Sequence, residues 1–170
     1  REGKTGIKPT WAKGIGGSGY DEINAVAETS DGGIIAGGDF NSSSIDLENG
    51  VSLSNKSRST YYSDGMIIKY SSAGEVEWAK GIGGSNNDQI NSVAETSDGG
   101  IIAGGDFGYA TIDLGNGVSL SSKGSVDGMI IKYNSTGECE WAKAIGGSSY
   151  DYINSVAETR DGGIIAGGYF

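Results

Sequence analysis

A segment of thirty residues occurs three times in this chain, and this repetition constrains the possible folds more than any other feature. Residues 11–40 and 78–107 are identical at 26 of 30 positions, and residues 141–170 differ from 78–107 at only six positions. The copies begin 67 and 63 residues apart. Near-identical units at such spacing are typical of one continuous array rather than of several independent domains.

The repeat boundaries predict two complete units flanked by two partial ones. We expect residues 9–17 to be the last strand of a preceding unit and residues 148–170 to be the first part of a final one. Between them lie the complete units, 18–84 and 85–147. No linker separates these units, so residues 1–170 are predicted to form a single array.

Each complete unit contains four short segments of β-forming residues separated by turn residues. In the second unit these segments are 90–96, 101–107, 127–133 and 138–145. The Asp98-Gly99 pair between the first two segments indicates a tight hairpin, because such turns require positive φ angles. A helical capping pattern at Ser85 leaves a short helix over 88–96 as an alternative, although its Ile, Val, Asn and Thr residues are poor helix formers.

A further hairpin is predicted between the second and third segments, where residues 112–114 and 118–120 flank an Asn-Gly pair. Adjacent apolar residues at Ile101-Ile102 and Ile130-Ile131 indicate sheets that are buried on both faces. Blades stacked around an axis have this property, since each lies between two neighbours. The predicted fold is therefore all-β, made of β-propeller blades with four antiparallel strands per unit, two of them complete and others partial.

Four motifs of the second unit occur in a fixed order. They are Asp98-Gly-Gly-Ile-Ile-Ala-Gly-Gly-Asp-Phe107, Thr111-Ile-Asp-Leu-Gly-Asn-Gly117, Asp127-Gly-Met-Ile-Ile-Lys-Tyr-Asn-Ser-Thr-Gly-Glu138 and Trp141-Ala-Lys-Ala-Ile-Gly-Gly147. Together they resemble the bacterial beta-propeller repeat family, over almost the whole chain except residues 1–8. The resemblance implies a propeller in a secreted or cell-surface protein. It implies no catalytic residues, because that family has no common activity.

The composition excludes several classes of function. The chain has no histidine, which removes His-dependent nucleophiles, His-ligated zinc and histidine general bases. Its net charge of −10 argues against a nucleic-acid partner, because such binding depends on neutralising phosphates. The single cysteine, Cys139, stands where the previous unit has Val76 and is expected to be a small buried hydrophobe. No apolar run is long enough for a membrane span, and we expect no cofactor.

Several motifs could carry chemistry, but each has a structural interpretation that we favour. The glycine spacing from Gly14 to Gly19 matches a dinucleotide fingerprint without the βαβ unit that such a site requires, so turns are expected there. Carboxylates recur at the starts of predicted strands and could bind Ca²⁺, but acceptors of backbone N–H bonds in turns are expected. These residues are Asp21, Asp64, Asp88, Asp127 and Asp151. No spacing singles out a pair of them for glycoside hydrolysis.

The three tryptophans, Trp11, Trp78 and Trp141, occupy identical repeat positions. Sugar stacking is one interpretation, but packing between adjacent blades is favoured because the position recurs inside a strand. We therefore expect Trp78 and Trp141 to be largely buried.

The copies differ mainly in two sets of loops, which an up-and-down blade places at the same end. The inter-repeat loops join one unit to the next, and the second-to-third loops join the second and third strands of a unit. Loops that vary on a rigid scaffold are typical of a binding surface, although neutral drift gives the same pattern. The candidate ligand-binding residues are Tyr20, Glu22, Asn86, Asn87, Gln89, Tyr150 and Tyr152 from the inter-repeat loops, with Tyr61 and Tyr62 from a second-to-third loop.

Three functional hypotheses remain open at this point. The first is a non-catalytic secreted or cell-surface module with a structural or adhesion role that binds a protein or a glycan through these loops. The second is a carbohydrate-active enzyme that uses loop carboxylates, and the third is a purely structural repeat that self-assembles. Two and a half units leave strand edges unpaired, which proteins avoid exposing. We therefore expect the chain to belong to a longer array or to assemble with other copies of itself.

Overall fold

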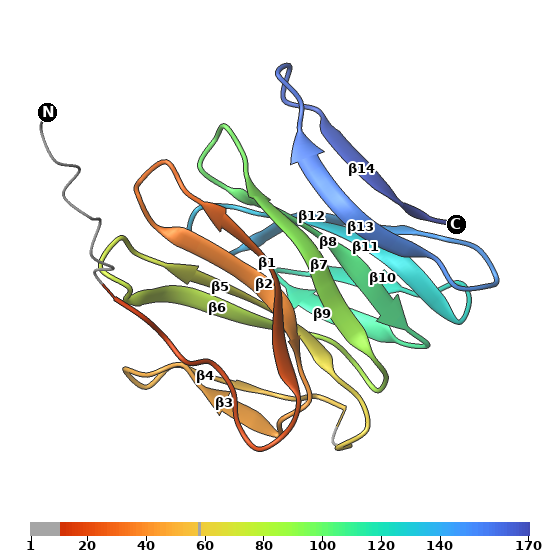
Figure 1. The fold of residues 1–170 in the computed structure, drawn as a ribbon. Helices are drawn as coiled ribbons and strands as arrows, with labels where there is room; N and C mark the ends of the chain where they lie inside the picture. The colour runs from red at the N-terminus through yellow and green to blue at the C-terminus, as the bar shows by residue number, and fades with distance from the viewer. Residues whose placement is uncertain (1–10, 58) are drawn as a thin grey trace, which may run out of the picture.

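The computed structural model describes residues 11–57 and 59–170 and shows an all-β protein built from antiparallel sheets (Figure 1). Two sheets have four strands each, one per complete unit. The first has the order β1-β2-β5-β6, with β1 (Asp21–Glu28), β2 (Ile34–Phe40), β5 (Asp64–Tyr70) and β6 (Val76–Ile82). The second has the order β7-β8-β11-β12, with β7 (Asp88–Glu95), β8 (Ile101–Gly108), β11 (Val126–Tyr133) and β12 (Cys139–Ile145).

Three two-stranded sheets complete the fold. The last repeat forms one of them, and the other two are the hairpins predicted between the second and third strands of each unit. Their strands are β13 (Tyr152–Glu158) with β14 (Ile164–Tyr169), β3 (Ser44–Asp46) with β4 (Ser52–Ser54), and β9 (Thr111–Gly115) with β10 (Val118–Ser121). The segment 88–96, for which a helix was the alternative, forms strand β7. The prediction of four antiparallel strands per complete unit is thus confirmed.

Residues 9–17, expected to be the last strand of a preceding unit, lie partly outside the described residues. Residues 11–17 form no strand. In the complete units the equivalent strand pairs with the third strand of its own unit. The described chain has no such partner strand beside residues 11–17, and a β-strand needs a hydrogen-bonded neighbour. The side chains of Trp11 and Ile15 nevertheless pack against the core on the outer face of the first sheet.

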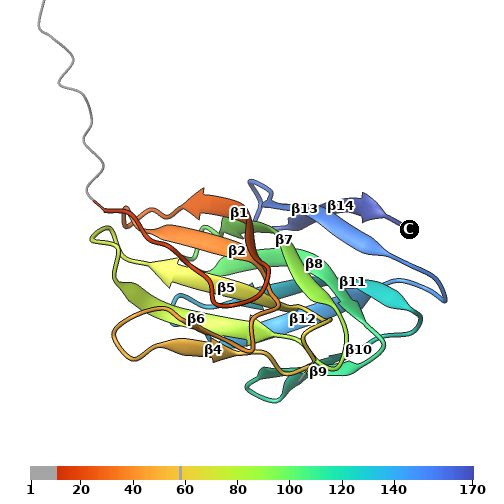
Figure 2. The same cartoon turned by 60° about the horizontal axis from the view of Figure 1, so that its bottom comes forward.

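The sheets stack face to face as layers, so that β1, β7 and β13 lie next to one another (Figures 1 and 2). This stacking explains the adjacent isoleucines. Ile101 belongs to the core between the first and second sheets, and Ile102 belongs to the core between the second sheet and β13–β14. Because neighbouring side chains of a strand point to opposite faces, consecutive isoleucines fill two different cores. Burial on both faces is confirmed.

Glycines in the second strand of each unit let the layers approach closely. A Cβ atom at Gly37 would lie 2.7 Å from Val93 Cγ1 and 2.8 Å from Ile90 Cγ2. At the next junction, a Cβ atom at Gly104 would lie 2.6 Å from Val156 Cγ1. At both junctions, the later layer therefore inserts an Ile and a Val from its first strand into a hollow that only glycine leaves open.

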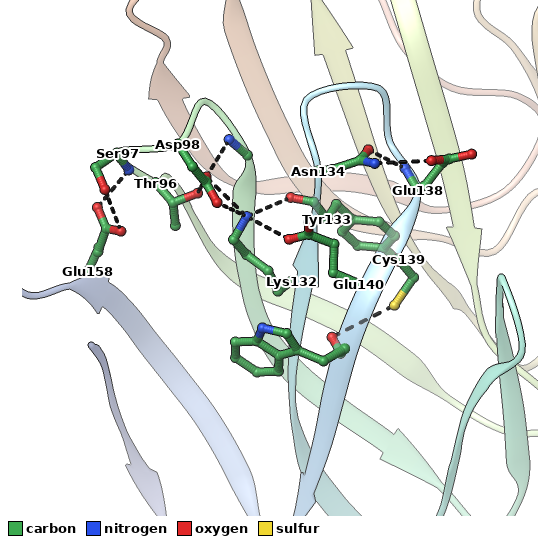
Figure 3. Close-up of polar contacts among 12 residues, drawn as sticks. Thr96, Ser97, Asp98, Lys132, Tyr133, Asn134, Glu138, Cys139, Glu140 and Glu158 are labelled. Atoms are coloured by element: carbon green, nitrogen blue, oxygen red, sulfur yellow. Dashed lines mark hydrogen bonds and ion pairs between the residues drawn. The ribbon is translucent and has the colours of Figure 1, made fainter. Parts of the chain in front are cut away.

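Polar contacts also repeat at both junctions. The Asn24 amide donates to the Ile90 carbonyl at 3.1 Å, and the equivalent Asn91 donates to the Ile153 carbonyl at 3.1 Å. At the turn after the first strand, the Ser30 backbone N–H donates to Glu95 at 2.8 Å. Ser97 makes the same contact with Glu158 at 2.7 Å (Figure 3). The same residues therefore face each other at both junctions, so the layers stack in the same register each time.

A buried lysine near the end of the third strand ties each complete sheet to its first hairpin turn. The Lys132 ammonium lies 3.0 Å from an Asp98 carboxylate oxygen and 3.1 Å from Glu140, and it donates to the Tyr133 carbonyl (Figure 3). The Thr96 hydroxyl, a backbone N–H and Lys132 lower the pKa of Asp98 to about 2. Lys69 makes the equivalent contacts in the first sheet. Cys139 is buried as expected, and burial raises the pKa of its thiol.

The prediction that Trp78 and Trp141 are both largely buried holds only in part. Trp78 is half-buried against the ring of Tyr133 in the next layer, with 6.0 Å between ring centroids, and its indole N–H donates to the Ser135 carbonyl at 3.1 Å. Trp141 is 36% exposed. In the described part of the chain the last repeat forms only β13 and β14, and no residues there equivalent to Tyr133 and Ser135 cover this indole.

Candidate functional site

The inter-repeat loops and the ends of the second-to-third loops lie at one end of the stack, where they form a polar groove of about 340 Å³. Its walls come from three consecutive units. The lining residues are Asp39, Ser63, Asn87, Asp88, Gln89, Asp106, Val126, Tyr150 and Tyr152. Four of the nine candidate residues therefore meet in one place: Asn87, Gln89, Tyr150 and Tyr152.

The other candidate residues lie elsewhere on the surface. Tyr20 is 86% exposed and lines a separate hollow of about 280 Å³ with Asn41 and Thr60. Tyr61 is also 86% exposed. The remaining three do not line the polar groove: Glu22 and Tyr62 are exposed, and Asn86 is half-buried. The sequence therefore predicted the correct end of the stack but did not separate these residues from those of the groove.

The groove also contains two carboxyl groups, Asp39 and Asp106, that were not among the predicted binding residues. They occupy equivalent positions at the ends of β2 and β8. The amide groups of Gln89 and Asn91 donate to Asp106 Oδ1 at 2.9 and 3.0 Å. Burial raises the pKa of Asp106 to about 6, and the Asp39 charge adds to this effect. A signal was present in the sequence, because the third copy has Tyr169 at this position.

The carboxylates at the starts of the first strands hold the inter-repeat loops in place. Backbone N–H groups of these loops donate to Asp21, Asp88 and Asp151, each at 2.8 Å. The donor to Asp21 is Gly17, which lies within the glycine-rich segment considered for phosphate binding. Since these amides are used by the protein itself, the interpretation of the glycines as turn residues and of the aspartates as turn acceptors is confirmed.

Two buried carboxyls at the starts of the third strands have a different environment. Lys56 N–H donates to Asp64 Oδ2 at 2.6 Å, and Lys123 N–H donates to Asp127 Oδ2 at 2.8 Å. The second oxygen, Oδ1, is buried in both residues and has no hydrogen-bond partner within the described chain. Asp64 Oδ1 and Asp88 Oδ2 both lie within 3 Å of the position that a Cβ atom at Gly83 would take.

These neighbouring carboxyls have strongly raised pKa values. Burial raises the pKa of Asp64 to about 6. Burial, and then the charges of Asp64 and Asp106, raise the pKa of Asp88 to about 7. Two carboxylates in so dry a place repel each other, which favours a protonated form. Both side chains are fully buried, and of the two only Asp88 belongs to the lining of the groove.

The groove can form many directed hydrogen bonds but has no arrangement typical of metal binding. Among residues 11–57 and 59–170, no three acidic or cysteine side chains come together closely enough to hold a metal ion. The groove instead offers the amides of Asn87 and Gln89 and the carboxyl of Asp106, with the rings of Tyr150 and Tyr152 nearby. Amides, carboxyls and aromatic rings together suit a ligand with many hydroxyl groups.

Comparisons with known proteins give one partial similarity. No protein-family model matches the chain. Over 108 residues, 62% of its length, the chain is 28% identical to the regulatory protein FlaEY of Caulobacter vibrioides. The matched region spans 11% of that protein. The part of the chain that the structure describes contains no helix of the length and apolarity needed to cross a membrane.

Proposed function

We propose that this chain is a non-catalytic repeat module of the β-propeller type, in a secreted or cell-surface protein, that binds a glycan at the polar groove. The observation that carries the proposal is the meeting of Asn87, Gln89, Tyr150 and Tyr152 from different units in that groove. These positions differ between otherwise near-identical copies. Variation on a rigid scaffold is typical of loops that recognise a ligand.

The blade assignment is supported by the stacking of four-stranded antiparallel sheets with their first strands side by side. The repeat motifs and the sheet order agree with propeller blades, which are radial stacks of such sheets. The secreted or cell-surface location depends on the resemblance to bacterial propeller repeats. The similarity to FlaEY covers too little of that protein to give this chain a regulatory role.

Glycan binding is favoured over binding to a flat protein surface because the groove is small, concave and polar. Its volume is close to the lower end of the range for small-ligand sites, about 300–1,000 Å³. The exposed Tyr150 ring, which is 50% accessible, can stack on a sugar face while Gln89 and Asp106 bond its hydroxyls. A protein ligand would insert one side chain or a loop into the same groove.

The raised carboxyl pKa values favour one other candidate, a carbohydrate-active enzyme, because a general acid must hold a proton near neutral pH. Asp106 is the relevant group, since it lines the groove. Its side chain is 4% exposed and already accepts two amide hydrogen bonds. These contacts suit a residue that orders the groove, so binding without turnover remains the preferred function.

Binding to an immobilised glycan array, with and without calcium, tests the proposal. We expect binding to selected glycans that is lost in Tyr150→Ala and reduced in Gln89→Ala. Tyr61→Ala is the matched control, because it removes an exposed tyrosine that does not line the groove. Equal loss in the control, or no glycan binding at all, would contradict the proposal. Release of sugar that Asp106→Asn abolishes would instead support the enzyme.

A further inference from the structure

The outward face of β13–β14 has a hollow of about 270 Å³. Ser155, Ala157, Ile165 and Gly167 line it, together with Val156 and Ala166. Ile165 is 60% exposed, and a Cβ atom at Gly167 would meet no described atom within 4 Å. The hollow is therefore an apolar sheet face with an open glycine at its centre.

The same face is filled at both internal junctions. Gly37 and Gly104 are the equivalents of Gly167, and each receives an Ile and a Val from the first strand of the next layer. Ile102, the equivalent of Ile165, is fully buried by this contact. The two internal junctions therefore show which side chains fit the hollow, namely an Ile and a Val of a first strand.

The opposite end of the stack carries the matching projection. Ile23 and Val26 of β1 are the equivalents of Ile90 and Val93, but they are 38% and 68% exposed. One molecule therefore has an open glycine hollow at one end and an exposed Ile and Val at the other. Surfaces that are complementary but different form head-to-tail contacts between identical chains.

One substitution gives this contact a charge pair that the internal junctions lack. At each internal junction a serine of the turn, Ser30 or Ser97, faces a glutamate of the next layer. The third copy has Arg160 at the serine position, and the first copy supplies Glu28 at the glutamate position. Docking in the internal register places the exposed Arg160 opposite the exposed Glu28. An arginine and a carboxylate form a charge-assisted hydrogen bond, which is stronger than the bond between a serine and a carboxylate at the internal junctions.

We propose that the β13–β14 face is a docking site for β1 of a second copy of this chain, in the register of the internal junctions. Ile23 and Val26 of one copy fill the hollow around Gly167 of the other, and Glu28 pairs with Arg160. The Asn154 amide donates to the Ile23 carbonyl of the docked copy, as Asn91 does to Ile153. The contact generates a ring if its rotation closes and a filament if it does not. The inference uses the stacked repeats of the proposed function but none of the groove residues.

Sedimentation of the 170-residue chain over a range of micromolar concentrations tests the docking site. We expect concentration-dependent association that Gly167→Leu, which fills the hollow, weakens at least about tenfold. Val26→Asp should weaken association similarly from the other end. Gly14→Ala is the matched control, since a Cβ atom there would also meet no described atom within 4 Å. Circular dichroism of each variant verifies that the β-sheet content is retained.

A mixing experiment isolates the head-to-tail geometry. Gly167→Leu keeps an intact projection and Val26→Asp keeps an intact hollow, so an equimolar mixture should form one-to-one dimers that neither variant forms alone. Arg160→Glu should weaken association, and adding Glu28→Arg to it should restore it. Association that survives Gly167→Leu, or a mixture that stays monomeric, would overturn the proposal.

Two further outcomes separate this inference from its alternatives. A longer polypeptide that carries one more repeat and loses the ability to associate would assign the face to that repeat and overturn docking of a second copy. Glycan binding by monomeric Gly167→Leu should be unchanged, because the groove is formed elsewhere. If the unsubstituted chain associates but binds no glycan, that result contradicts the proposed function and leaves the docking site standing.

Discussion

Replacement of Asp64 by Asn should stabilise the chain at about pH 8 and leave its stability near pH 4 unchanged. Asp64 Oδ2 accepts a backbone hydrogen bond, whereas Oδ1 is buried beside Asp88 with no partner in the described chain. In the variant, the amide oxygen can accept the bond from Lys56 N–H, which places the neutral amide nitrogen on the side of Asp88. The substitution therefore removes a buried charge beside Asp88.

The magnitude follows from the pKa of Asp64, which burial raises from 3.8 to about 6. At about 1.4 kcal/mol per pH unit, this shift makes ionised Asp64 cost up to about 3 kcal/mol of folding free energy. Because the pKa of the folded state exceeds that of the unfolded state, the folded chain retains the proton between about pH 4 and 6. The contribution of Asp64 to stability is therefore most favourable below this window and becomes unfavourable as pH rises through it. Asp88, with a pKa of about 7, extends the window upward.

Urea denaturation followed by tryptophan fluorescence at about pH 4, 6 and 8 measures the effect. We expect the midpoint for Asp64→Asn to exceed that of the unsubstituted chain at pH 8 and to match it at pH 4. Asp113→Asn is the control, because it changes an exposed carboxylate that also accepts a backbone N–H bond. A variant that is less stable at pH 8, or that keeps the full pH dependence, would refute the reasoning.

Three other substitutions test the packing between layers, each measured by the same urea titration. Trp78→Ala should cost about 3 kcal/mol and Trp141→Ala less than about 1, because only the first indole is covered by the next layer; equal costs would contradict the layer assignment. Gly104→Ala should cost about 1–3 kcal/mol because its methyl group collides with the next layer. The Gly14→Ala control should be close to neutral, and a neutral Gly104→Ala would mean that the layers separate easily. Lys132→Met should cost about 1.5–3 kcal/mol through the loss of charge-assisted hydrogen bonds, and an unchanged midpoint would show that these bonds contribute nothing.

The strands and their order could be predicted because the information is local. Asp98-Gly99 specifies a hairpin, and the pair Ile101-Ile102 reports burial on both faces, whatever the neighbouring layers are. Near-identity between copies then requires each unit to adopt the same sheet. The helix considered for 88–96 does not form, because its residues pair with β8 and pack between two layers.

The groove was predicted only in part, for a physical reason. Variable residues indicated the correct end of the stack, but not that Gln89 and Tyr150 share a groove while Tyr61 lies outside it. Asp106 was missed because its role depends on the amides of Gln89 and Asn91, which reach it across strands.

The sequence by itself determined the repeat, the four strands of each complete unit and the burial of both sheet faces, because hairpin turns and side-chain alternation act over a few residues. The tertiary structure alone decided what the layers do to one another. It covered Trp78 with the next layer and left Trp141 more exposed, although the two share a motif, and it filled the hollows at Gly37 and Gly104 but not at Gly167. Identical local sequences diverge in this way because their environments depend on whether another layer lies against them.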